Sequence, residues 1–168
     1  MITIKKQCVE IFHDNNILQL RTAEGTDTEY LRDLKNSHRE YFFHRQEITQ
    51  EQQVAWFTTY QSRSNDFMFI VWLNGVRIGC MGIRLLDNAW DVYNVILGDQ
   101  QYKSAGWMGR AFQAMLSFSI GIHQAPIGLS VLKNNPAIWW YKKNGFKVES
   151  ESLDHFVMSF DSSLARRV

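Results

Sequence analysis

The chain has 168 residues, of which 45% are hydrophobic and 21% charged, and 18 Lys and Arg residues oppose 17 Asp and Glu residues. This composition is typical of a globular protein, and the formal charge of +1 argues against a nucleic-acid partner, which would select a basic surface. Cys8 and Cys80 are too few for a disulfide framework or a four-cysteine zinc site. We expect a single domain over residues 1–168, with its core at about 17–160, and no metal.

Membrane and secretory segments are not expected. The longest strongly apolar stretch, Phe67–Leu73, is far shorter than the roughly 20 residues of a membrane-spanning helix. The first residues lack the apolar run of a signal peptide. These patterns favour a reduced, cytoplasmic compartment.

The first part of the chain predicts an edge arm, a strand and two helices. The arm is expected over Ile2–Phe12 and the strand over Ile17–Arg21. Thr26 or Asp27 can cap a helix that ends near Ser37. A second helix is expected to begin after a capping box, formed by Thr49 and Gln52.

The chain then changes to the periodicity of strands. The Asn74-Gly75 dipeptide tolerates the positive φ of a tight turn, so the apolar runs on either side predict a hairpin. The remaining pattern alternates between strands and helices and indicates a mixed α/β domain. The strands are expected over Phe67–Leu73, Val76–Leu86, Trp90–Leu97, Ile127–Leu132, Lys147–Glu151 and His155–Phe160, and the helices over Gly106 to about Ile122 and Ala137–Asn144.

Two stretches carry the chemistry. In the first, a strand ends at Gly98 and a helix opens at Gly106. The first amides of a helix have no partner within the helix and its dipole favours negative charge, so such a loop can hold a phosphate. The spacing is neither a P-loop nor a dinucleotide fingerprint. In the second stretch, Asn134 follows a strand, and Ala137 and Tyr141 lie four residues apart on one helix face before Gly145.

Together the two stretches resemble the GNAT superfamily of N-acetyltransferases. The resemblance is to the acetyl-CoA motif Gln/Arg-x-x-Gly-x-Gly/Ala, followed by Asn-x-x-Ala-x-x-x-Tyr-x-x-x-Gly-Phe. The second motif is matched at Asn134, Ala137, Tyr141, Gly145 and Phe146. The first is matched imperfectly, with Lys103, Gly106 and Met108 in the three places and Gly109 one residue late.

The resemblance implies a fold and a cofactor. The fold is a central mixed β-sheet, mostly antiparallel with a splayed parallel pair, flanked by about four helices. The cofactor is acetyl-CoA as acyl donor, with its pantetheine arm paired to the strand at Ile96 and Gly98, with Leu97 between them. Its pyrophosphate would rest on the loop. The residues implied to bind acetyl-CoA are Ile96, Leu97, Gly98, Lys103, Ser104, Ala105, Gly106, Trp107, Met108, Gly109, Arg110 and Asn134.

The implied reaction is direct transfer of an acetyl group from the thioester to an amine. Tyr141 is the candidate general acid toward the departing thiolate, and burial as an ordinary core aromatic is the alternative. For the general base the candidates are Asp91, on the strand before the loop, and Glu40, between the first two helices. Each of these two carboxylates can equally be structural or solvated.

The acceptor is left open between several classes. Residues 31–57 are similar to the opening of acetyltransferases that act on nucleotide-linked amino sugars, and also to the branch that acetylates ribosomal proteins. A small-molecule amine of the first kind is the leading expectation, and a protein N-terminus is the alternative. A non-catalytic acyl-CoA-binding module, or a purely structural domain with a decayed loop, would have no need for Tyr141. Either a monomer or a homodimer fits the sequence.

Overall fold

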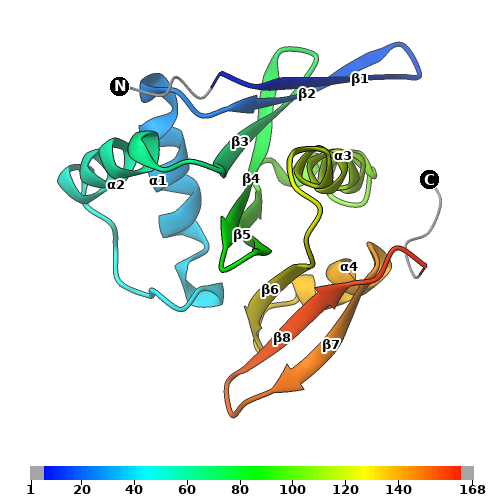
Figure 1. Ribbon diagram of the computed structural model, residues 1–168. Helices are drawn as coiled ribbons and strands as arrows, with labels where there is room; N and C mark the ends of the chain where they lie inside the picture. The colour runs from blue at the N-terminus through cyan, green and yellow to red at the C-terminus, as the bar shows by residue number, and fades with distance from the viewer. Residues whose placement is uncertain (1–5, 164–168) are drawn as a thin grey trace.

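In the computed structural model, residues 6–163 are described, and within this range eight strands form one sheet with four α-helices around it (Figure 1). The strands are β1 Cys8–His13, β2 Asn16–Thr22, β3 Asp66–Leu73, β4 Val76–Leu86, β5 Ala89–Leu97, β6 Ile127–Leu132, β7 Phe146–Glu151 and β8 His155–Phe160. The α-helices are α1 Thr28–Ser37, α2 Gln50–Ser62, α3 Trp107–Ile122 and α4 Ala137–Lys143, and short 3₁₀ segments cover Gly25–Asp27, Arg39–Tyr41 and Gln100–Tyr102.

The order of strands in the sheet is β1-β2-β3-β4-β5-β6-β8-β7. Every neighbouring pair is antiparallel except β5 and β6, which are parallel. The predicted fold, a mostly antiparallel mixed sheet with one splayed parallel pair and four flanking helices, is confirmed. Residues 2–5 of the predicted N-terminal arm lie outside the described residues.

Local sequence signals account for most element ends. Thr49 Oγ1 accepts from the Gln52 amide and the Gln52 side chain accepts from the Thr49 amide, which is the predicted capping box of α2. Asn74 and Gly75 have φ of 50° and 81°, as the tight turn between β3 and β4 requires. Gly145 ends α4 with φ of 96°, a conformation that favours glycine.

The helices divide between the two faces of the sheet (Figure 1). α3 and α4 pack on one face, where Phe112, Met115 and Tyr141 join the larger buried cluster. α1 and α2 cover the other face, where Leu31, Leu34 and Tyr60 belong to a smaller buried cluster. The strand order therefore places β4 and β5 between two helical layers of different size.

Candidate functional site

The parallel strands β5 and β6 pair over only two positions before they separate. Their register joins Trp90 to Ile127 and Asp91 to Gly128, so the rest of β5 has no partner on the β6 side. The Gly98 amide donates to the Ile78 carbonyl of β4 at 2.8 Å. Because backbone groups alternate sides along a strand, the amide and carbonyl of Leu97 face the open side instead. Of the three predicted positions, Leu97 thus offers its backbone to a ligand in the splay, whereas the Gly98 amide is already engaged.

The loop before α3 carries a group of amides without acceptors. Within residues 6–163, the Lys103 and Ala105 amides bond to the carbonyls of Gln100 and Tyr102, and the Arg110 amide bonds to the Gly106 carbonyl. Among the same residues, no acceptor meets five neighbouring amides, which are those of Ser104, Gly106, Trp107, Met108 and Gly109. Free amides at a helix start attract an anion. The structure therefore places a group of free backbone donors in the predicted loop.

Two positive φ values shape this loop. Ser104 has φ of 65° and Gly106 has φ of 84°, so each lies in the left-handed region. Gly106 is the N-cap of α3, and a Cβ added there would meet no atom within 4 Å. Backbone conformation, rather than space, is therefore the reason for glycine at position 106.

Met108, which departs from the motif, does not obstruct the amides. Its side chain is buried in the larger core cluster, and its Sδ and Cε lie 3.2 and 3.0 Å from the position that a Cβ on Gly79 would take. The side chain thus packs against β4. A Cβ on Gly109 would meet Asn144 Oδ1 at 3.4 Å, which is an ordinary contact, so space does not require a glycine there.

Two cations flank the amide cluster. Lys103 is exposed and Arg110 is partly buried. Neither has an Asp or Glu partner within 4.0 Å in the described part of the chain, which contains ion pairs elsewhere. Their charges are therefore available to a phosphate group at the loop.

Tyr141 lies on α4 and belongs to the larger buried cluster on the α3/α4 side of the sheet. The residue is 7% exposed, and its ring contacts those of Phe112, Trp140 and Phe146. Burial raises the pKa of its hydroxyl well above the ordinary value, and the Cys80 thiol on β4 adds a smaller effect in the same direction. The phenol is therefore protonated in the neutral range.

Asn134 joins the two helical layers. Its Nδ2 donates to the backbone carbonyl of Glu40 at 3.0 Å, so the segment between α1 and α2 is tied to the end of β6. The Glu40 side chain is exposed. The side chain of Asn134 therefore contacts the segment between α1 and α2, and Glu40 takes part in this contact through its backbone.

Asp91 lies on β5 and is held by Arg84 of β4, whose Nε donates to Asp91 Oδ2 at 3.0 Å. Burial raises the pKa of Asp91, and Arg84 opposes that shift. Arg84 also lies over the ring of Tyr93, whose hydroxyl donates to the buried Asp66. Asp91 therefore belongs to a charged network on the α1/α2 side of the sheet.

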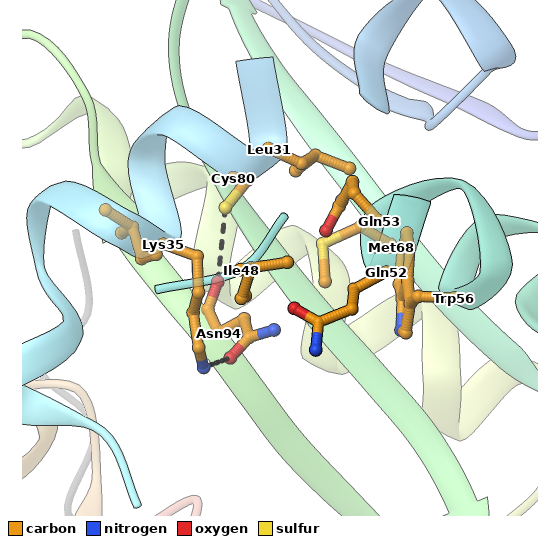
Figure 2. A pocket seen from close by; sticks show the side chains of 10 residues that line it. Leu31, Lys35, Ile48, Gln52, Gln53, Trp56, Met68, Cys80 and Asn94 are labelled. Atoms are coloured by element: carbon orange, nitrogen blue, oxygen red, sulfur yellow. Dashed lines mark hydrogen bonds between the residues drawn. The ribbon is translucent and has the colours of Figure 1, made fainter. Parts of the chain in front are cut away.

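On that same side, a cavity of about 120 Å³ lies between the helices and β3–β5 (Figure 2). Figure 2 shows Lys35 and Asn94 together at one side and Trp56 at the other. Asn94 has φ of 49° and lies where the register of β4 and β5 shifts. Its carbonyl accepts from Cys80 Sγ at 3.3 Å. Ile96 also lines the cavity, so the cavity lies against the strand that borders the splay.

Lys35 is the charged residue of this cavity. Its Nζ donates to Asn94 Oδ1 and lies 3.6 Å from the centroid of the Phe42 ring. Burial lowers the pKa of Lys35 to about 8, and nearby Arg84 adds to that effect while Cys80 opposes it. Lys35 comes four residues after Leu31, on the apolar stripe of α1, and that spacing is the signal that sequence reasoning missed.

Metal-binding clusters and membrane-spanning helices are both absent from residues 6–163. In this range, no three His, Cys, Asp or Glu side chains gather where they would hold a metal ion. Among the described helices, none has the length and apolarity needed to cross a membrane.

Comparison with known proteins finds likeness in structure and not in sequence. No family model and no curated protein matches the chain. A solved structure of an uncharacterized protein from Bacillus halodurans aligns with a TM-score of 0.77 at 15% identity, covering 95% of this chain and 93% of that one. Spermidine N-acetyltransferase from Vibrio cholerae, in complex with CoA and spermine, aligns with a TM-score of 0.71 at 20% identity over 85% of this chain and 94% of its own.

A third structure, apo FdhC, described as a nucleotide-linked sugar GNAT, aligns with a TM-score of 0.67 at 19% identity and covers 88% of each chain. The chain therefore has the fold of the GNAT N-acetyltransferases. The splay, the loop before α3 and the cavity under α1 and α2 all lie within this fold.

Proposed function

We propose that the protein is an acetyl-CoA-dependent N-acetyltransferase that moves an acetyl group directly to the primary amine of a small molecule. The observation that carries the proposal is the cluster of five acceptor-free amides before α3, after the strand that separates from β6. Any helix start leaves some amides free, but the left-handed Ser104 and Gly106, and two cations without an acidic partner among residues 6–163, distinguish this loop. The solved neighbours in complex with CoA support the same cofactor.

The residues present fit acetyl-CoA. The amides of Ser104, Gly106, Trp107, Met108 and Gly109 would hold its pyrophosphate, with Lys103 and Arg110 adding charge. The backbone of Leu97 would pair with the pantetheine arm in the splay. Ala105 would contribute through the loop's shape, since its amide already bonds to Tyr102.

Acetyl-CoA supplies an activated acetyl group, because its thioester C–S bond breaks as the acceptor nitrogen forms the new C–N bond. The chain orients the two reactants across β5, which is the main source of rate enhancement in direct transfer. An ammonium acceptor loses one proton before it attacks and a second after the C–N bond has formed. The Tyr141 hydroxyl gives its proton to the departing sulfur and is reprotonated by the second of these. Burial keeps the phenol protonated, as this role requires, and the raised pKa also makes it a weak acid.

For the proton on the acceptor amine, we propose Asp91, acting through water, ahead of Glu40. Arg84 affects the pKa of both Asp91 and Lys35, which connects Asp91 to the lysine of the cavity. The Glu40 side chain, by contrast, is exposed on the connection between α1 and α2. Neither carboxylate lines the cavity. A relay through water is therefore needed in either case.

The amino group of a nucleotide-linked amino sugar is the first acceptor to test. The similarity of residues 31–57 to enzymes of that class supports this choice, as does the likeness to FdhC. The cavity has room for the amine end of such a molecule, and the nucleotide would remain outside it.

Isothermal titration of the purified protein with acetyl-CoA, followed by an assay for thiol release with amine acceptors, tests the proposal. Micromolar binding and acceptor-dependent release of CoA are expected. Binding without turnover of any amine would favour a non-catalytic acyl-CoA module. Absence of binding at millimolar acetyl-CoA would overturn the cofactor assignment.

A further inference from the structure

The cavity under α1 and α2 has an unusual charge composition for an amine-binding site. Its polar side chains are Lys35, Gln52, Gln53, Asn94 and the Cys80 thiol, and no Asp or Glu lines it. An amine that carries a positive charge at neutral pH gains nothing from such a lining, and Lys35 repels it. A polyamine, with several such charges, is therefore a poor match for this cavity.

Lys35 itself lacks a counterion. Within residues 6–163, no Asp or Glu oxygen lies within 4.0 Å of its Nζ, which contacts the Asn94 amide oxygen and the face of Phe42 instead. A carboxamide oxygen and an aromatic ring compensate a buried cation only in part. Because the compensation is incomplete, burial lowers the pKa of Lys35.

The apolar stripe of α1 would accept a leucine or methionine at position 35 at no electrostatic cost. A half-buried charge that destabilises the folded chain is retained where function requires it, as in many binding sites. The charge sits beside Asn94, at the irregularity of β5, and Ile96 of the same strand lines the cavity. Lys35 is thus placed beside the strand that borders the splay, where the proposed thioester would lie.

We propose that Lys35 binds an anionic group of the acceptor, so that the substrate is a primary amine bearing a carboxylate or phosphate near the amine, and not a polyamine. This inference rests on the proposed acetyltransferase function and narrows its substrate class. In the resting protein Asn94 and Phe42 hold the Lys35 ammonium in place. When the acceptor enters, its anion becomes the counterion that residues 6–163 do not supply.

The size of the cavity limits how far the anion lies from the amine. A volume of about 120 Å³ is somewhat smaller than that of an engineered cavity of about 150 Å³ that binds benzene. It accommodates the amine end of an acceptor together with a single small anionic group. An α-amino acid meets this condition within the cavity, and an amino sugar meets it when its phosphate reaches the cavity mouth.

Matched pairs of acceptors that differ in one anionic group test the proposal. L-Alanine with L-alaninamide examines a carboxylate, glucosamine 1-phosphate with glucosamine examines a phosphate, and spermidine supplies the polycation. Turnover of each is compared in the parent protein, in Lys35→Met, in the charge-retaining Lys35→Arg, and in Lys147→Met as a matched control. Lys147 is an exposed lysine of β7, away from the cavity.

The expected result is a higher kcat/KM for the anionic member of at least one pair. Lys35→Met should lower the ratio of kcat/KM within that pair on the order of 10- to 100-fold, as loss of a charge-assisted hydrogen bond does. Lys35→Arg should retain most of the ratio, and Lys147→Met all of it. The pair that responds identifies carboxylate or phosphate as the anion.

A binding measurement that needs no turnover extends the test to acceptors that are not among these pairs. The Lys35 side chain is followed by NMR of ¹³C-labelled lysine, assigned from its loss in Lys35→Met, during titration of the CoA complex with acetate, inorganic phosphate and spermine. Acetate or phosphate should raise the pKa of Lys35, because an anion stabilises the charged form, and spermine should not.

The inference is wrong if neither anion perturbs Lys35 and no pair favours its anionic member, or if spermidine is the preferred acceptor. Acetyl-CoA binding measured on the same samples separates this result from failure of the proposed function. Intact binding with turnover of uncharged amines would leave an acetyltransferase whose acceptor is not anionic. Loss of acetyl-CoA binding in the parent protein would overturn both proposals.

Discussion

The two faces of β5 carry site features of different kinds. On the α3/α4 side the candidate site consists mainly of backbone groups, which are the acceptor-free amides before α3 and the open edge of β5. On the α1/α2 side it consists of side chains, with Lys35 and Asn94 at one end of a small cavity. A backbone site depends on turns and helix starts, whereas a side-chain site depends on which residues converge from separate elements.

This difference separates what the two sides do. Under the proposed function, the backbone side would bind the acyl donor, which is common to every reaction of this kind, and the side-chain side would select the acceptor. Substitutions on the first side should therefore affect acetyl-CoA and every acceptor alike. Substitutions on the second should change one acceptor relative to another.

The largest effect is expected for Tyr141→Phe. Removal of the hydroxyl takes away the proton donor for the leaving sulfur and keeps the ring that packs on Phe112 and Phe146. We expect kcat to fall about 100-fold or more for every acceptor, with the affinity for acetyl-CoA unchanged. Steady-state thiol release and titration calorimetry measure the two quantities, and an unaltered kcat would rule out the general-acid role.

Gly106→Val examines the backbone side directly. A β-branched residue does not adopt a φ of 84° without strain of roughly 1–3 kcal/mol, so the loop must rearrange and its amides lose their convergence. We expect the Kd for acetyl-CoA to rise about 10- to 100-fold in calorimetry. Gly121→Ala is the matched control, because that glycine lies in α3 with no atom within 4 Å of an added Cβ. Equal losses in both variants would contradict the phosphate-loop assignment.

Asp91→Asn should produce a smaller loss, of about tenfold in kcat, because water can still carry the proton to other acceptors. As a base, Asp91 must be ionised, so the rate of the parent protein should fall as pH decreases through its pKa. Burial raises that pKa above the ordinary range for Asp, and the acid limb should shift accordingly. A pH profile that is the same in both proteins would remove Asp91 as the base and leave Glu40→Gln to be measured.

Lys35→Met should affect stability by the smallest amount, about 1 kcal/mol, and in the stabilising direction at pH 7. The pKa of Lys35 is about 8 in the folded protein and 10.5 when unperturbed, so the folded state disfavours the charged lysine. This penalty is fully present below pH 8 and is relieved as pH rises toward 10.5. Urea denaturation of the two proteins from pH 7 to 10 should therefore show converging stabilities. A constant difference would mean that packing, and not charge, separates them.

Much of the fold was predictable because its signals are local. The capping box at Thr49, the turn at Asn74 and Gly75, and the glycine after α4 each fix one end of an element through short-range geometry. The loop before α3 was predictable for the same reason, since a helix start exposes amides whatever the rest of the protein does.

The cavity under α1 and α2 was not predictable in this way. The positive φ of Asn94 arises from a shift in register between β4 and β5, which depends on how two whole strands pair. In the sequence, Lys35 cannot be told from a solvated lysine, because its burial depends on α2 and on strands that lie far away along the chain. The alternation of backbone groups along β5 was also needed to distinguish Leu97 from Gly98.

The hydrogen bond from Asn134 to the Glu40 carbonyl has a thermodynamic consequence for the affinities of the two ligands. It links the end of β6, next to the splay, to the connection that leads through Ile48 to the cavity under α1 and α2. To the extent that acetyl-CoA repositions Asn134, it also changes the affinity of the cavity for its acceptor. Linkage then requires the acceptor to change the affinity for acetyl-CoA by the same factor.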